Sequence, residues 1–267
     1  MGHVRRVHSG GVAMHPINEL LSLFELRLMR VPHASPRADL ERYEANLRTL
    51  AAEGARGYRV VREPVFEAGN HPSSYVDFEC EFASAALARN TVREILDVGS
   101  YRMFVRGMTA GLTVTSIDVR PRDPTSANES VLTCDAKQLP LPDGSIDAIV
   151  SLCAIEHFGL GRYGDAFDPD GDLKALTEMK RVLRPGGVLV LSTTVTAGPG
   201  TIAFNAHRIY PLGDLRAMLS ALEVESEAFY SRGREARCTE GELQRDAGVW
   251  DVYCGCWRKP ALGLPTG

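Results

Sequence analysis

Short apolar runs rich in β-branched residues alternate with helix-like stretches from residue 94 onward, and this alternation constrains the fold more than any other feature. Five such runs lie at residues 94–100, 113–119, 131–135, 146–153 and 187–195. A stretch with helical periodicity, "DLKALTEMKRVL", separates the fourth run from the fifth. This alternation is typical of a parallel sheet with helices on both faces. The sequence therefore predicts a doubly wound, mostly parallel, Rossmann-like α/β sheet.

Two further strand-like runs, at residues 224–230 and 250–257, are expected to pair as a hairpin at the edge of the sheet, which gives seven strands. The N-terminal part of the chain has a helical pattern instead, with leucines at helical spacing over residues 37–53. We therefore expect three parts, which are a flexible leader with a first helix over residues 1–36, a helical cap over 37–90 and the sheet domain over 91–260.

Composition excludes several classes of protein. The 30 basic and 34 acidic residues give a net charge of −4, so nothing in the charge balance favours nucleic acid as a partner. No apolar run approaches the ~20 residues that span a bilayer, and the N-terminus has no secretory signal pattern. The six cysteines show no C-x-x-C pair, which favours free thiols in a reducing cytoplasm. A homo-oligomer is compatible with this composition.

Polar residues follow each of the five predicted strands. Parallel α/β sheets bind ligands beyond the carboxyl ends of their strands. Asp118 comes 19 residues after Gly99, a spacing at which a carboxylate can accept both hydroxyls of a ribose. The residues that end the five strands are Asp97, Gly99 and Ser100, then Asp118, then Asp135, then Glu156 and His157, and finally Ser192 to Thr194. The turn after the first strand lacks G-x-G-x-x-G, which argues against a nicotinamide-dependent oxidoreductase.

Two segments, "DAKQLPLPDGSIDAIVS" and "EMKRVLRPGGVLVLST", make the chain resemble the class I S-adenosylmethionine-dependent methyltransferases over Glu94 to Thr194. The resemblance implies a methyltransferase that uses S-adenosylmethionine as cofactor. It also implies roles for the strand-end residues. Asp97, Gly99 and Ser100 would lie near the methionine part of the cofactor, Asp118 at the ribose, and Asp135 and Ala136 at the adenine. The residues from Ser151 to His157, including Leu152, would line the cofactor and face the acceptor.

The chain departs from the family pattern D-x-G-x-G-x-G at two positions. Tyr101 and Met103 stand where the second and third glycines are usual. Small residues there let the backbone approach the cofactor closely, so Tyr101 is expected to point outward or to reshape the turn. The departure keeps open an alternative function, a non-catalytic binding protein that retains the methyltransferase fold.

"EHFGLGRYGD" and "FNAHRIY" look like signatures of an uncharacterised subfamily of the same superfamily, some of whose bacterial relatives we associate with surface-polysaccharide genes. This association favours O-methylation of a hydroxylated small molecule or sugar. A histidine base suits such an acceptor, and guanidinium groups suit a carboxylate or phosphate on it. The candidates are His157, His207 and Glu156 for catalysis, and Arg162, Tyr163, Asn205 and Arg208 for acceptor binding. An ion pair with a nearby aspartate is the alternative for either arginine.

Four aspartates crowd the segment after the fourth strand. The EF-hand spacing fails here, because Ala166 falls at the first ligand position and Thr177 at the position of the bidentate glutamate. We therefore expect Asp170 or Asp172 to cap the next helix. A magnesium ion held by Asp165, Asp168 and Asp170 is the alternative.

Overall fold

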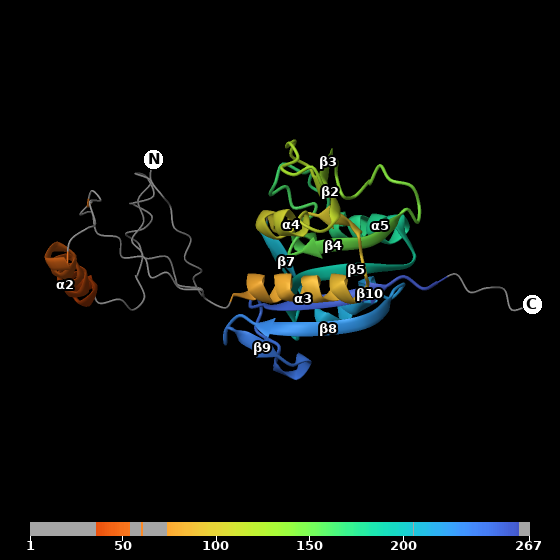
Figure 1. Cartoon of the computed structure of the whole chain (residues 1–267). Coiled ribbons are helices and arrows are strands. Elements are labelled where there is room, and N and C mark those ends of the chain that lie inside the picture. The colour runs from red at the N-terminus through yellow and green to blue at the C-terminus, as the bar shows by residue number, and fades with distance from the viewer. Residues whose placement is uncertain (1–35, 54–59, 61–73, 205, 262–267) are drawn as a thin grey trace, which may run out of the picture. The chain divides into compact units, whose positions relative to one another are not determined.

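The computed structural model of the chain describes residues 36–53, 60, 74–204 and 206–261 (Figure 1). It contains two units, Met1–Asn70 and His71–Gly267. The first unit contributes one described helix, α2 (Pro36–Glu53), which matches the helix expected at 37–53. The leader expected over residues 1–36 lies outside the described residues, apart from Pro36.

The second unit is built on a ten-stranded sheet. Five parallel strands form its centre in the order β3-β2-β1-β4-β5. These strands are β1 (Glu94–Val98), β2 (Thr113–Asp118), β3 (Glu129–Thr133), β4 (Ile146–Leu152) and β5 (Leu183–Thr196). The doubly wound, mostly parallel sheet predicted from the apolar runs is therefore confirmed.

The strands beyond β5 differ from the expected edge hairpin. β10 (Asp251–Arg258) does pair with β8 (Glu223–Ser231), but it lies inside the sheet, antiparallel to both β5 and β8. The short strand β9 (Ala236–Cys238) pairs with the other side of β8. Two more short strands lie beside the end of β5. Strand β7 (His207–Pro211) pairs with β5 in parallel, and β6 (Thr201–Ala203) pairs with β7 antiparallel. These three short strands have no strong apolar pattern, which explains the count of ten in place of seven.

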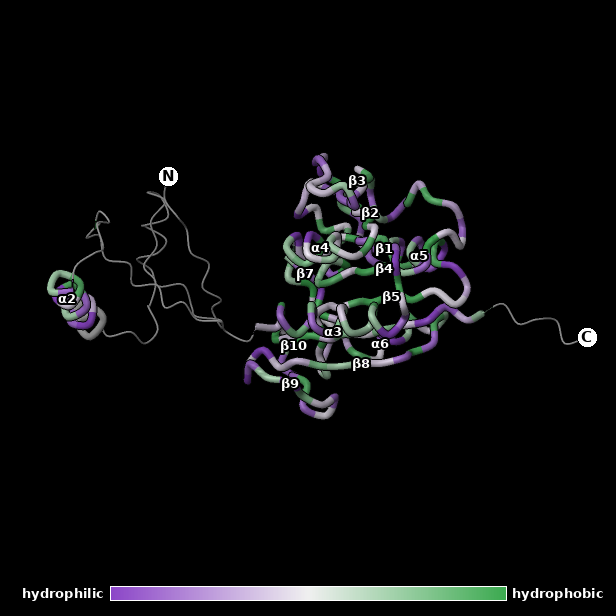
Figure 2. The backbone as a smooth tube through the Cα atoms, viewed as in Figure 1, coloured by the Kyte–Doolittle hydropathy of each residue, from purple (hydrophilic) through white to green (hydrophobic). Residues whose placement is uncertain are grey.

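Helices cover both faces of this sheet. They are α3 (Tyr75–Arg89), α4 (Arg102–Met108), α5 (Gly171–Val182) and α6 (Leu212–Met218), with short 3-10 turns at Ile155–His157 and Glu240–Glu242. Leu96 and Val98 of β1 belong to the core under α5 and α6, whereas Ile95 packs with α3 and α4. Figure 2 shows the hydrophobic residues concentrated in the central strands β4 and β5. Both faces of β1, β4 and β5 are thus buried, as the continuous apolar runs predict, whereas the outer strand β3 is partly exposed.

Helix α3 begins with a capping box. The Ser74 hydroxyl accepts from the backbone N–H of Asp77, and the Asp77 carboxylate accepts from the N–H of Ser74. The helix was expected to belong to a cap over residues 37–90, but it packs on β10, β5 and β4 (Figure 1).

Among the described residues, no helix combines the length and the apolar character needed to cross a membrane.

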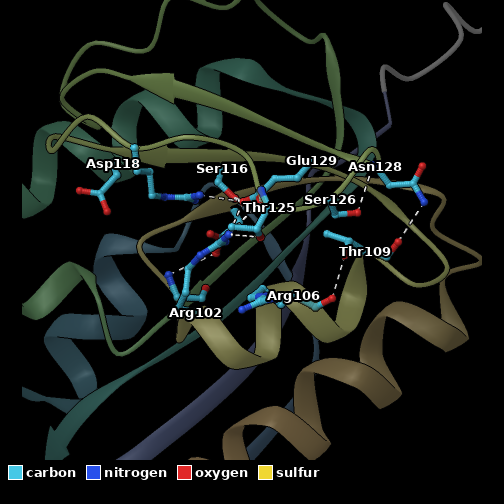
Figure 3. Close-up of polar contacts among 12 residues, drawn as sticks. Arg102, Arg106, Thr109, Ser116, Asp118, Thr125, Ser126, Asn128 and Glu129 are labelled. Atoms are coloured by element: carbon cyan, nitrogen blue, oxygen red, sulfur yellow. Dashed lines mark hydrogen bonds and ion pairs between the residues drawn. The ribbon is translucent and has the colours of Figure 1, made fainter.

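A buried carboxylate on β3, that of Glu129, connects this strand to β2, to the loop after β2 and to the first residue of α4 (Figure 3). The side chain of Glu129 is fully buried, and Nη1 and Nη2 of Arg102 lie 2.6 and 2.8 Å from its two oxygens. Nη1 of Arg122 lies 2.9 Å from the same carboxylate. The hydroxyl of Ser116 on β2 and the backbone N–H of Thr125 also donate to it. The bonds from Arg102 outweigh burial and hold the pKa of Glu129 well below its ordinary value.

Replacing this carboxylate should destabilise the fold. Glu129→Gln leaves two partly buried guanidinium groups without their counter-charge, so we expect the free energy of unfolding to fall by about 3 kcal/mol. Urea denaturation at pH 7 measures the change. Glu94→Gln, at the exposed first residue of β1, is the matched control and should change stability little. Equal stabilities of the two variants would contradict a structural role for Glu129.

Candidate functional site

A cavity of about 440 Å³ opens at the carboxyl ends of β1, β2, β3 and β4. Its volume lies in the range of small-molecule sites. Eight of the residues predicted for the site line this cavity, which are Asp97, Gly99, Ser100, Asp118, Asp135, Ala136, His157 and Tyr163. Asp165, predicted only as a metal ligand, lines it as well. The strand ends therefore meet around one space, although the residues are far apart in the sequence.

Gly99 makes the turn from β1 to α4 possible. Its φ of +78° lies in the left-handed region, and a Cβ there would come within 3.0 Å of the Cβ of Ala154. The backbone N–H of Ser100 donates to Oδ1 of Asp97 at 3.2 Å, and the Ser100 hydroxyl accepts from the N–H of Leu152 at 3.1 Å. These bonds fix the turn against the end of β4. Asp97 is 4% exposed, and its burial outweighs the bonds from Ser100 and raises its pKa to about 6.

The two side chains that replace family glycines do not line the cavity. Tyr101 is partly buried in the core formed by α3 and α4, and its hydroxyl lies near Glu79 and Cys153. Met103 is 80% exposed. The departure from D-x-G-x-G-x-G thus places no large side chain in the cavity.

Asp118 lies at the cavity wall and pairs with Arg120, two residues along. Nε and Nη2 of Arg120 lie 3.0 and 3.1 Å from the two carboxylate oxygens. Partial burial raises the pKa of Asp118, but the bonds and charge of Arg120 outweigh it, so the pKa is lowered overall. Asp118 therefore stays ionised at neutral pH and can accept hydrogen bonds, as a ribose site requires. The Arg120 guanidinium also lies over the ring of Tyr163, 5.1 Å from its centroid.

His157 is the histidine that faces the cavity. Its Nδ1 contacts the carbonyl oxygen of Ala206, and a carbonyl can only accept, so Nδ1 carries the proton. Burial lowers the pKa of His157 to about 4, which makes the ring neutral at pH 7. Nε2 is therefore left with its lone pair, 4.0 Å from Oε1 of Glu156. This is the protonation state that a general base needs.

Glu156 and Leu152 lie behind the cavity wall. Glu156 is 1% exposed and accepts from the Thr193 hydroxyl at 3.0 Å. Burial is the main reason that its pKa rises to about 8. Leu152, also 1% exposed, packs in the core with α3 and α4. Neither side chain lines the cavity, so Glu156 can act on a ligand only through neighbouring residues that do, such as His157 and Cys153.

The acceptor candidates beyond the cavity divide into two kinds. Nη1 and Nη2 of Arg208 donate to the carbonyl oxygens of Phe158 and Pro169, and its Nε lies 3.4 Å from Asp172. Arg208 is thus buried in an internal ion pair, the alternative considered for it, and it anchors the loop after β4. Arg162 is exposed, and its one hydrogen bond within the described part of the chain is to the carbonyl of Ala206. His207 is half-buried beside His157, and Asn205 lies outside the described residues.

The aspartates of this loop bind protein groups. Asp165 accepts from the backbone N–H groups of Gly159, Gly161 and Tyr163, and so organises the turn. Asp168 lies 2.7 Å from Nζ of Lys174. Asp170 occupies the N-cap position of α5 but makes no side-chain cap bond. Within the described ranges, no group of three or more His, Cys, Asp or Glu side chains could hold a metal ion.

One functional candidate, Glu79, was missed from the sequence, and it contacts Cys153, which belongs to the range Ser151 to His157 expected to line the cofactor. Glu79 on α3 is fully buried, and its Oε1 accepts from the Cys153 thiol at 2.6 Å. Its Oε2 has no hydrogen-bond partner among the residues that the structure describes. Cys153 lines the cavity with a φ of +46°, which is strained for a residue with a side chain. The sequence does contain a signal for the burial of Glu79, because this residue lies four and seven residues before Ala83 and Ala86 and so shares their helix face, whereas Glu81 does not.

Comparison with known proteins identifies the family. Residues 113–246 match the family model described as "Caenorhabditis protein of unknown function, DUF268", which covers half of the chain. The chain belongs to this family. A "Probable S-adenosylmethionine-dependent methyltransferase" of Mycolicibacterium smegmatis is 34% identical over 39% of the chain and 34% of the relative. A protein of that name from Mycobacterium tuberculosis is 28% identical over 65% of the chain and 55% of the relative. The chain thus spans a third to about half of these relatives' length.

Solved structures share the fold. A 1,6-didemethyltoxoflavin-N1-methyltransferase of Burkholderia thailandensis, with S-adenosylhomocysteine bound, is similar at a TM-score of 0.51 and 14% identity over 88% of this chain and 94% of that one. The N-methyltransferase NodS of Bradyrhizobium japonicum, also with S-adenosylhomocysteine, gives 0.51 and 17% over 82% and 98%. The [4+2]-cyclase SpnF gives 0.53 and 17% over 81% and 94%. The fold and the relatives together confirm the resemblance to class I methyltransferases.

Glu79 should make stability depend on pH. Burial raises its pKa from the ordinary 4.5 to about 7, so the unfolded chain releases this proton first as the pH rises. The wild type therefore loses up to about 3 kcal/mol from this group between pH 5 and 8. Glu79→Gln carries no such proton, and we expect its stability relative to wild type to increase across that window. Chemical denaturation at several pH values measures the difference.

The control is Glu81→Gln on the same helix, where the carboxylate is exposed and pairs with Arg237. Its stability relative to wild type should stay constant with pH. A Glu79→Gln difference that is also independent of pH would show that Glu79 titrates normally in the folded protein.

Proposed function

We propose that this protein is an S-adenosylmethionine-dependent methyltransferase. The observation that carries the proposal is the single cavity into which Gly99, Asp118, Asp135 and His157 converge from four strand ends. The names of the curated relatives and the S-adenosylhomocysteine in two solved structures of this fold support the choice of cofactor.

The cavity wall fits this cofactor along its length. Asp118 would accept the ribose hydroxyls, Asp135 and Ala136 would border the adenine, and Asp97 with the Gly99 turn would hold the methionine part. Gly99 lines the cavity and carries no side chain, which allows a ligand to approach the backbone closely there. When bound, the cofactor supplies an electrophilic methyl group on its sulfonium. The chain then has to hold the acceptor's reacting atom in line with the methyl carbon and the sulfur, and to take up the proton that this atom loses.

We propose His157 as the group that takes this proton, and a hydroxylated small molecule or sugar as the acceptor. The neutral ring offers Nε2 to a hydroxyl. Protonation would place a positive charge 4.0 Å from Glu156, whose carboxyl would stabilise that charge once it ionises. N-methyltransferases are among the similar structures, so amines are the competing acceptor class in the assay.

The fold alone does not set the reaction. SpnF has a similar fold and is a cyclase, and a non-catalytic binding protein is the second function that this chain could have. The buried, partly unpaired Glu79 beside the cavity favours an enzyme, because active sites commonly keep carboxyls whose burial destabilises the fold. We place the reaction in the cytoplasm, which the six free cysteines support.

Cofactor binding should depend on Asp118. We expect calorimetric titration with S-adenosylmethionine and S-adenosylhomocysteine to show stoichiometric binding, and Asp118→Ala to weaken both by about 100-fold through loss of two charge-assisted hydrogen bonds. Asp123→Ala, exposed in the same loop, is the control and should bind normally. Adding magnesium should change nothing if the aspartates after β4 are structural. Absence of binding by the wild type would refute the proposed cofactor.

The role of His157 calls for a turnover assay. Transfer of label from methyl-tritiated S-adenosylmethionine to panels of sugars, phenols and amines identifies the acceptor class. We expect His157→Ala to reduce turnover at least about 100-fold, while S-adenosylhomocysteine binding stays within a few-fold of wild type. A variant with wild-type turnover would exclude His157 as the base.

A further inference from the structure

Five ring side chains form a row that begins at the cavity, with each ring next to the following one. Consecutive ring centroids are 5.6 Å apart from Tyr163 to His157, 6.3 Å from His157 to His207, 5.6 Å from His207 to Trp250 and 5.9 Å from Trp250 to Tyr75. Tyr163 and His157 line the cavity. The rings come from four segments of the chain, so only the folded sheet brings them together.

Two arginines lie against this row. The Arg232 guanidinium is 3.7 Å from the ring centroid of Trp250 and 5.9 Å from that of Tyr75. The Arg162 guanidinium is 5.4 Å from the centroid of Tyr163. The ring faces hold both groups in place through cation–π attraction, which orients a guanidinium without neutralising it. We call these five rings and two arginines the arginine–aromatic rim.

Neither arginine of the rim has a carboxylate within ion-pair distance in the part of the chain that the structure describes. Other arginines near the cavity are paired, Arg120 with Asp118 and Arg208 with Asp172. Burial is the largest cause of the lowered pKa of His207, and the positive charges of Arg162 and Arg232 lower it further. The positive potential of both side chains therefore meets at His207, beside the cavity.

The carboxylates nearest the rim are hydrogen-bonded to backbone N–H groups and not to its two guanidinium groups. Asp251 accepts from the backbone N–H groups of Arg232 and Gln244, and Asp165 from those of the turn after β4. Glu156 is buried, and its raised pKa keeps it mostly protonated at pH 7. The rim thus presents two oriented guanidinium groups beside ring faces, an arrangement that matches an oxyanion attached to a carbon skeleton.

We propose that the arginine–aromatic rim binds an anionic group of the methyl acceptor, a carboxylate or a phosphate, while the ring faces contact the acceptor's carbon skeleton. The methyl acceptor is then an acidic molecule such as an acidic sugar. Its bound anion lies on the rim and its reacting group reaches the cavity at His157. This assignment rests on the proposed function only in calling the bound molecule the acceptor.

Trp250 provides a direct signal for the test. The chain has two tryptophans, and Trp257 is buried with its Nε1 bonded to the hydroxyl of Tyr253. Tryptophan fluorescence of the full chain, with Trp250→Phe to assign the signal, is followed during titration with D-glucuronate, D-glucose 1-phosphate and neutral D-glucose. We expect saturable binding of at least one anion, at least about 10-fold tighter than glucose. The tighter anion identifies the class, carboxylate or phosphate.

Charge-removing variants test the residues. Arg162→Gln and Arg232→Gln should each weaken anion binding at least about 10-fold, and the double variant should abolish it. Arg232→Lys should restore only part of the affinity, because an ammonium lacks the planar fork. Arg237→Gln is the control, an arginine over the ring of Phe78 that already pairs with Glu81, and it should bind like wild type. Thermal melts verify that each variant is folded.

Three results would overturn the proposal, namely no anion binding, equal binding of glucose, or anion binding that survives the double variant. Calorimetry with S-adenosylhomocysteine on the same variants separates this outcome from failure of the proposed function. Normal S-adenosylhomocysteine binding without anion binding refutes the rim alone. Anion binding without S-adenosylhomocysteine binding refutes the methyltransferase and retains an anion site.

Discussion

Strands β1, β4 and β5 are buried on both faces, and this constraint determines where the protein can meet a ligand. Leu96 and Val98 pack under α5 and α6 while Ile95 packs under α3 and α4, so the polar side chain that β1 directs at the cavity, Asp97, comes from its carboxyl end, just before Gly99. Polar groups can reach a small molecule only where the strands end. The cavity at the ends of β1 to β4 is the consequence.

The carboxyl groups and the guanidinium groups near this cavity differ in how deeply they are buried. Buried carboxyl groups lie in its wall, at Asp97, and behind it, at Glu79 and Glu156, and burial raises the pKa of each. The guanidinium groups of Arg162 and Arg232, which pair with no carboxylate among the described residues, belong to the arginine–aromatic rim. Groups of opposite charge that are kept apart cost stability that pairing would recover, and such sites commonly serve a ligand.

The crowded segment after β4 has two separate tasks. Its aspartates and glycines build the turn, and Arg208 fastens the segment to β7 through the carbonyls of Phe158 and Pro169. This leaves His157 and Tyr163 directed at the cavity. The polar composition that marks the segment is therefore mostly structural, and the ligand-facing side chains are few.

The sequence by itself determined the parallel sheet and the strand-end residues of the cavity, because strand and helix periodicity, glycine turns and capping are properties of neighbouring residues. Only the tertiary structure decided that Arg208 is an internal anchor, that β10 lies inside the sheet, and that Glu79 meets Cys153. It also decided that Arg232 and Trp250 join His207 at the rim. These contacts join segments far apart in the chain, and local pattern carries no information on which distant residues will pack together.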